Sequence, residues 1–231
     1  MKKNPSSKNQ KSKIQVKDDS HLVEIKVTSE QVFSGKFLKV FRDEVRLPDG
    51  NPAHREYLTH PGAAMIIPVL GNNVLMVRQY RYSVGQVFLE FPAGKIDRGE
   101  TSLQTAQREL LEETGLKTDD IRFVQRIHPV IGYSNEYIDI YISRNHTRVQ
   151  SQLDHGEFVE PVELPMSKVL KMAEQGELTD VKTLIGVLLL PKLLPEKQNS
   201  KKKTRRKTKA QKPIKTKINR RGPIKKSRSK L

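Results

Sequence analysis

The alternation of apolar and polar residues predicts strands over much of the chain. β-branched and aromatic residues at a period of two are typical of strands with one buried face. The stretch 63–70 is almost entirely apolar, and Gly71, Asn72 and Asn73 separate it from the apolar stretch 74–78, which predicts a hairpin. The predicted strands lie at residues 21–27, 37–46, 55–59, 63–70, 74–78, 87–91, 121–127, 137–143 and 158–164.

Helical periodicity is clearest at 101–114. Thr101 is a suitable N-cap, Gln104 completes a capping box, and Gly115 ends the segment. An inward-facing apolar stripe is expected from Leu103, Ala106 and Leu110. Two further helices are predicted at 167–175 and 180–190. The pattern therefore indicates an α+β fold with mixed strands around one central helix.

Charge divides the 231 residues into three parts. Residues 1–17 hold six Lys and no acid, and residues 197–231 hold 17 Lys and Arg and no acid. The middle, 18–196, holds 20 basic and 26 acidic residues, so the net charge of +17 comes from the two arms. Neither arm has apolar periodicity, and their charges repel, so both are predicted to be disordered.

Composition excludes several classes of protein. The absence of cysteine rules out a disulfide framework, thiolate zinc sites and a cysteine nucleophile. The longest apolar run, 184–191, is too short to span a bilayer. The basic N-terminus lacks the apolar core of a secretory signal. We therefore expect a soluble, cytoplasmic protein.

The central helix concentrates carboxylates in a chain that is otherwise basic. Glu109 and Glu113 are four residues apart and share one face, and Glu112 adjoins it. Arg108 can act as their counter-charge. Because the apolar stripe faces the core, the carboxylates are expected to point away from it. Two interpretations remain open, a solvated acidic face and a site for Mg²⁺ or Mn²⁺, which prefer oxygen ligands.

A regular spacing runs from 94 to 116, at positions Gly94, Glu100, Arg108, Glu109, Leu110, Glu112, Glu113, Gly115 and Leu116. This spacing resembles the Nudix box, the signature of hydrolases that cleave a nucleoside diphosphate linked to another moiety. Other segments resemble the ADP-ribose pyrophosphatase branch of this family, at residues 60–64, 77–81, 89–94, 132–136 and 157–160.

The resemblance covers roughly residues 25–192 and implies an organisation for the chain. The expected fold is the Nudix α/β/α sandwich with a mixed β-sheet, plus a small N-terminal antiparallel sheet. Residues 1–17 are a basic arm, 18–62 an N-terminal β-subdomain that forms a homodimer, 63–196 the catalytic domain and 197–231 a Lys/Arg-rich tail.

The resemblance also implies metal-dependent hydrolysis of ADP-ribose, or of a related nucleoside diphosphate sugar, to AMP and a sugar phosphate. It implies that Mg²⁺, with Mn²⁺ as the second option, is held by Glu109 and Glu113, with Glu112 and the Ala93 carbonyl nearby. Glu100 is expected to have a structural role or a role in the outer shell of the metal.

The general base is left open by the sequence. Relatives are expected to supply a glutamate from the acidic loop after the last long strand, which here contains Asp154, His155 and Glu157. Many relatives have Glu where this chain has His155. Glu157 can therefore bind metal while His155 or Asp154 acts as base, or Glu157 can do both, or metal alone can activate water. A surface histidine without a role is the alternative for His155.

Arg81 is the first candidate for binding substrate, because the arginine fork suits phosphate. Glu136 is a candidate acceptor for a ribose hydroxyl, and Lys95 and Arg55 are candidates for phosphate or dimer contacts. For each of these residues an ordinary surface role is the alternative.

The basic tail leads to two alternatives to nucleoside diphosphate sugar hydrolysis. Segment 197–231 can bind nucleic acid or another polyanion without sequence preference, since it has no aromatic residue. A hydrolase acting on RNA 5′ ends is therefore one alternative, and a non-catalytic Nudix-fold regulatory protein is the other. The intact box disfavours the second, because a pure binder has no need to keep repelling carboxylates together.

Overall fold

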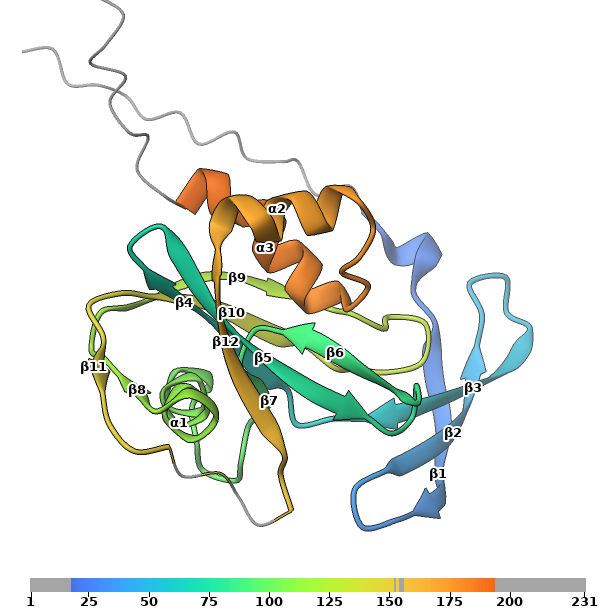
Figure 1. The fold of residues 1–231 in the computed structure, drawn as a ribbon. Coiled ribbons are helices and arrows are strands. Elements are labelled where there is room, and N and C mark those ends of the chain that lie inside the picture. Colours follow the sequence, from blue (N-terminus) through green and yellow to red (C-terminus); the bar gives the residue numbers. More distant parts are fainter. Residues whose placement is uncertain (1–17, 152, 154–155, 194–231) are drawn as a thin grey trace, which may run out of the picture. The chain divides into compact units, whose positions relative to one another are not determined.

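The computed structural model describes residues 18–151, 153 and 156–193. The first strands of the chain form a small antiparallel sheet (Figure 1). Its strands are β1 (Ile25–Ser34), β2 (Lys39–Arg46) and β3 (Pro52–Thr59), in that order. The strand predicted at 21–27 starts later, because Ser20–Leu22 form a short 3-10 turn. The polar part of β1 forms a strand because β1 pairs with β2 over its whole length. Every residue of β1 is exposed.

The larger sheet is mixed and places β12-β5-β4-β10-β9 side by side. Only β10 and β4 run parallel, while β6 pairs with β5 and β7 with β4 in antiparallel register. The strands are β4 (Ala63–Leu70), β5 (Asn73–Arg81), β6 (Gln86–Glu90), β7 (Ala93–Lys95), β9 (Ile121–Ile127), β10 (Ile138–Ser143) and β12 (Val159–Pro165). Two short strands, β8 (Leu116–Lys117) and β11 (Thr147–Arg148), pair separately.

Helices cover both faces of this sheet. Helix α1 (Ser102–Thr114) lies on one face, and α2 (Met166–Glu174) and α3 (Val181–Leu193) lie on the other (Figure 1). Strand β4 is therefore buried along nearly its whole length, as its apolar sequence predicts. Ala64 and Ile66 pack toward α1, while Met65 lies against α3 at Gly186. The predicted α/β/α sandwich is confirmed.

Both ends of α1 follow the sequence. The Thr101 hydroxyl accepts from the Gln104 amide, the Gln104 side chain accepts from the Thr101 amide, and Gly115 adopts a left-handed conformation with φ of 66°. The predicted apolar stripe is partly wrong, because Leu103 is 40% exposed while Ala106 and Leu110 are buried. Leu103 belongs to the first turn, outside the surface that packs on the sheet.

The described residues belong to one compact unit that ends at Leu193. Both basic arms, and with them the prediction that they are disordered, lie outside the described residues. None of the described helices is long and apolar enough to cross a membrane.

Candidate active site

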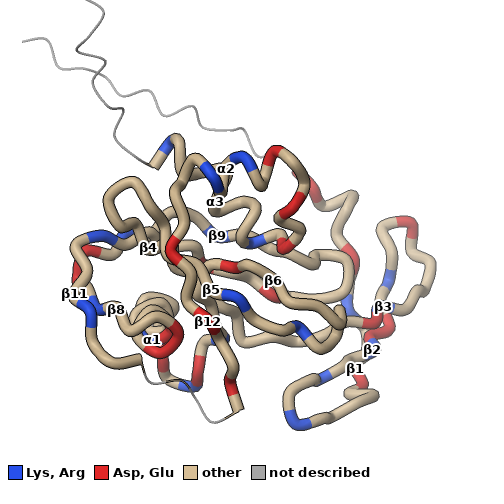
Figure 2. Tube along the Cα trace, viewed as in Figure 1, with Lys and Arg blue, Asp and Glu red and all other residues tan. Residues whose placement is uncertain are grey.

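The central glutamates are buried at the junction of α1 and β7. Glu109 is 8% exposed and Glu113 is 5% exposed, so the expectation that they point away from the core is wrong. Gly94 in β7 makes this possible, because a Cβ there would lie 1.7 Å from Glu109 Oε1. The glycine of the box therefore creates the space into which the helix turns its carboxylates. Figure 2 marks the acidic side of α1.

Arg108 is the counter-charge of this carboxylate group. Its Nη1 donates to Glu109 Oε1 at 2.7 Å and to Glu112 Oε2 at 2.9 Å, and its Nε donates to Glu100 Oε1 at 2.9 Å. The hydrogen bond from Arg108 lowers the pKa of Glu100 to about 2, and Glu100 also accepts from the Thr105 hydroxyl. Glu100 thus ties the loop before α1 to its second turn.

Two carboxyl groups have raised pKa values. Burial raises the pKa of Glu109 to about 7, against the opposing charge of Arg108. Burial, followed by the charge of Glu109, raises the pKa of Glu113 to about 8, and a backbone hydrogen bond from Ala93 opposes the rise. Glu157 raises both values further, so its charge acts at the same place. Glu113 Oε2 is buried without a hydrogen-bond partner in the described part of the chain.

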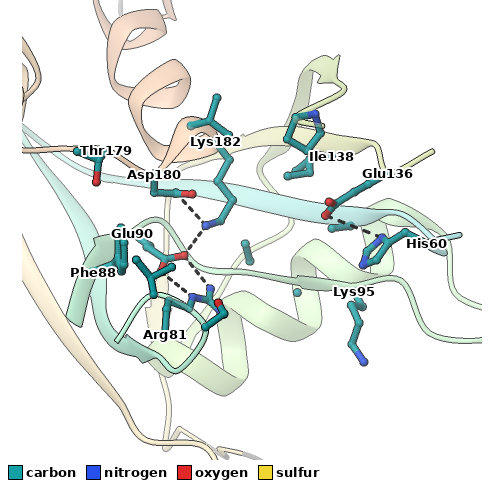
Figure 3. A pocket seen from close by; sticks show the side chains of 17 residues that line it. His60, Arg81, Phe88, Glu90, Lys95, Glu136, Ile138, Thr179, Asp180 and Lys182 are labelled. Atoms are coloured by element: carbon teal, nitrogen blue, oxygen red, sulfur yellow. Dashed lines mark hydrogen bonds and ion pairs between the residues drawn. The ribbon is translucent and has the colours of Figure 1, made fainter. Parts of the chain in front are cut away.

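A cavity of about 520 Å³ opens beside β7 (Figure 3). Two polar groups line it, one on each side. On one side Glu136 Oε1 lies 3.9 Å from His60 Nδ1, and Lys95 is nearby. On the other side are Arg81, Glu90, Asp180 and Lys182.

Arg81 projects from the end of β5 into this cavity. Its Nε and Nη2 donate to the two oxygens of Glu90, at 2.8 and 2.7 Å. This hydrogen bonding raises the pKa of Arg81, and the charge of Glu113 adds to the effect. Arg81 thus stands between the buried Glu90 and the glutamates of α1.

The structure brings part of the predicted site together in this cavity, while Glu109, Glu112 and Glu113 are not among its lining residues. Ala93, Gly94, Lys95, Arg81 and Glu136 all line the cavity.

Four other predicted residues lie elsewhere or are not described. Glu157 lines a separate hollow with Phe158 and Tyr80. Arg55 does not line the cavity, and on the N-terminal sheet its Nε donates to Glu24 Oε2 at 2.8 Å. His155 and Asp154 lie outside the described residues, so the choice of base stays a prediction.

Comparison with known proteins decides the family. A family model described as the NUDIX domain matches residues 59–183. The chain belongs to the Nudix family. A second model, the nucleoside diphosphate sugar hydrolase N-terminal domain, matches residues 24–58, which include β1 and β2 and most of β3. The protein is therefore a Nudix hydrolase that carries both parts of the nucleoside diphosphate sugar branch.

Individual relatives agree with this assignment. The Nudix chain is 35% identical to a methanol dehydrogenase activator of Bacillus methanolicus, over 71% of this chain and 90% of the relative. It is 33% identical to an ADP-ribose pyrophosphatase of Bacillus subtilis, over 73% and 93%. A crystal structure of an ADP compounds hydrolase has the same fold, with a TM-score of 0.68 at 21% identity, over 74% of this chain and 94% of that one.

Nudix hydrolases generally need divalent metal ions. The metal ligands expected from the sequence stay a prediction, and among the described residues no three His, Asp or Glu side chains converge to hold an ion. The physical reason is Arg108, whose guanidinium occupies the position between Glu109 and Glu112. The buried oxygen of Glu113 without a partner, and the space at Gly94, nevertheless fit a cation held by Glu109, Glu113 and the Ala93 carbonyl.

Sequence reasoning missed four residues that line the cavity, namely His60, Glu90, Asp180 and Lys182. Glu90 carried a detectable signal, because an acid at the end of the apolar stretch 87–91 has to be paired if that strand is buried. His60 lies in the stretch 60–64 that resembles the family, but nothing in the sequence placed His60, Asp180 or Lys182 in the cavity, since their positions depend on how β3 and α3 pack in this Nudix fold.

Proposed function

We propose that the protein hydrolyses the pyrophosphate bond of ADP-ribose or of a related nucleoside diphosphate sugar, releasing a nucleoside monophosphate and a sugar phosphate. The match of residues 24–58 to the N-terminal domain of nucleoside diphosphate sugar hydrolases carries this proposal. Relatives named ADP-ribose pyrophosphatase and ADP-sugar pyrophosphatase support it. So does a cavity of about 520 Å³, which is within the usual range for small-ligand pockets.

Mg²⁺ is the proposed metal, with Mn²⁺ as the second option, because both prefer oxygen ligands. Glu109, Glu113 and the Ala93 carbonyl would hold it, with Glu112 and Glu157 close by. A bound cation of this kind neutralises phosphate charge and lowers the pKa of water. In the structure Arg108 bridges Glu109 and Glu112. With a cation bound, it would keep its hydrogen bond to Glu100.

The remaining roles follow from where the side chains lie. Arg81 would bind the pyrophosphate, because its Nη1 faces no hydrogen-bond acceptor among the described residues. Lys95 and Glu136, across the cavity, would bind phosphate and a ribose hydroxyl. Glu157 or His155 would act as the base.

The test is release of a nucleoside monophosphate by the full chain, AMP from ADP-ribose, ADP-glucose, NADH and diadenosine polyphosphates and GMP from GDP-mannose. Each substrate is assayed with Mg²⁺, with Mn²⁺ and with EDTA. Cleavage of ADP-ribose that EDTA abolishes is the expected result. Cleavage of none of these compounds would refute the proposed reaction.

We further propose that the N-terminal sheet forms a homodimer. Ile25, Val27 and Phe33 of β1 are exposed apolar residues, as are Phe37 and Leu38 in the following turn. An apolar surface of this kind is usually covered by a partner. Arg55 on β3 is then a candidate dimer contact. Light scattering coupled to size exclusion should give twice the mass of the chain, and Phe33→Ser should reduce it to one copy.

A regulatory role is the second candidate, since one relative is named a methanol dehydrogenase activator. The intact box favours hydrolysis as the basis of any such effect.

The basic segment 197–231 is beyond both family matches, and we propose it as a contact for nucleic acid or another polyanion. Lost affinity for a random RNA after deletion of this segment is the expected result, and unchanged affinity would contradict it.

A further inference from the structure

Two cations share one buried carboxylate on the wall of the cavity (Figure 3). Glu90, the last residue of β6, is only 2% exposed and accepts hydrogen bonds from Nε and Nη2 of Arg81. Lys182, in the first turn of α3, donates its Nζ to Glu90 Oε2 and, at 2.9 Å, to Asp180 Oδ2. Arg81, Glu90, Lys182 and Asp180 therefore form an unbroken series of alternating charges.

The start of α3 is held by further contacts, one of which shares Asp180 with this series. Asp180 caps the helix by accepting from the Thr183 amide at 3.1 Å. The Thr183 hydroxyl accepts from the Phe91 amide at 3.2 Å, directly after Glu90. Gly186, one turn later, lies against the Phe91 ring, where an added Cβ would be 3.0 Å from it. These contacts hold Lys182 beside Glu90, and its side chain is only 11% exposed.

This arrangement determines how Arg81 faces the substrate. Glu90 occupies Nε and Nη2, which sets the plane of the guanidinium and leaves Nη1 for a phosphate. Because Lys182 also binds Glu90, the carboxylate is shared and neutralises less of the charge on Arg81. Without Lys182, the other three groups would carry a net negative charge next to Glu113, which disfavours an anionic ligand.

We propose that Glu90 and Lys182 are positioning residues that hold the Arg81 guanidinium toward the pyrophosphate, with α3 as their anchor. The inference rests on the proposed function, since the anion that Arg81 meets is the pyrophosphate of that substrate. Lys182 acts through Glu90 and Arg81. The competing explanation, direct contact of Lys182 with the substrate, makes a different prediction.

A double-mutant cycle separates the two explanations. Calorimetric binding of ADP-ribose to the full chain in EDTA, without turnover, is measured for Arg81→Met, Lys182→Met and the double variant. Lys182→Met should weaken binding about tenfold, the effect of one charge-assisted hydrogen bond. In the Arg81→Met background, Lys182→Met should weaken the binding of ADP-ribose by a further factor of less than about two. Lys192→Met, at the exposed end of the same helix, is the matched control and should bind like the wild type.

Lys182→Arg should recover most of the lost affinity, because it keeps a cation on Glu90. Additive effects in the cycle, or full affinity in Lys182→Met, would overturn the proposal. If the double variant fails to fold, as judged by its melting curve, Glu90→Gln replaces Lys182→Met in the cycle. That change removes the buried charge instead of leaving it unpaired.

Failure of this inference can be told apart from failure of the proposed function. A wild type that binds ADP-ribose but does not cleave it with Mg²⁺ refutes the reaction, and the binding cycle still tests the positioning pair. If ADP-ribose does not bind, the cycle is measured with inorganic pyrophosphate, the group that Arg81 is proposed to hold. Absence of binding to that probe as well would overturn the inference.

Discussion

Replacing Glu113 by glutamine should stabilise the metal-free protein at alkaline pH while abolishing its activity. The carboxyl of Glu113 is 5% exposed, and burial together with Glu109 raises its pKa from an ordinary 4.5 to about 8. Between these two values the folded protein binds a proton that the unfolded chain has lost. The free energy of unfolding therefore falls as pH rises from about 4.5 to about 8, and it stays low above that.

The raised pKa sets the size of the effect. Each pKa unit corresponds to about 1.4 kcal/mol, so the full shift would cost roughly 4–5 kcal/mol at pH 9. Glu109 titrates in the same range, with a pKa of about 7, and Arg108 can reorient toward new charge. We therefore expect about half of this cost, on the order of 2 kcal/mol. Relief of that cost in Glu113→Gln should raise the melting temperature by roughly 4–8 °C.

The assay is thermal unfolding followed by circular dichroism in EDTA, from pH 5 to pH 9. The wild type should lose stability across this range more steeply than Glu113→Gln, and the two should be similar near pH 5. Glu174→Gln, an exposed residue on α2, is the control and should follow the wild type. Mg²⁺ added at pH 8 should raise the melting temperature of the wild type and leave Glu113→Gln unchanged. Parallel pH profiles for wild type and variant would refute the reasoning.

Three further predictions test other parts of the structure. Gly94→Ala should lower turnover at least about 100-fold, because the added Cβ would displace Glu109 from its pocket, whereas Gly132→Ala, at an open position without a positive φ, should retain most activity. Gly115→Ala should cost about 1–3 kcal/mol in urea unfolding, because its φ is 66° and a Cβ would lie 2.6 Å from the Val149 carbonyl oxygen. Deleting 197–231 should leave kcat/KM for ADP-ribose unchanged, and a large loss would instead favour a substrate held by the basic tail.

Local features of this protein could be predicted from the sequence with good accuracy. The capping box at Thr101, the left-handed Gly115 and the apolar β4 all depend on residues close together in the chain, so their chemistry is visible without a fold. The spacing of the Nudix box identified the family for the same reason, because its glutamates lie within one helix and the preceding loop.

Contacts between distant segments were decided by the tertiary structure alone. Only the packing of α1 on β7 shows that Glu109 and Glu113 are buried behind Gly94, and only the packing of α3 brings Lys182 to Glu90, 92 residues earlier. Helical periodicity places side chains on a face but does not say which neighbour covers that face. The sequence by itself therefore determined which groups are available for chemistry, and the order of strands and the docking of helices decided which of them meet.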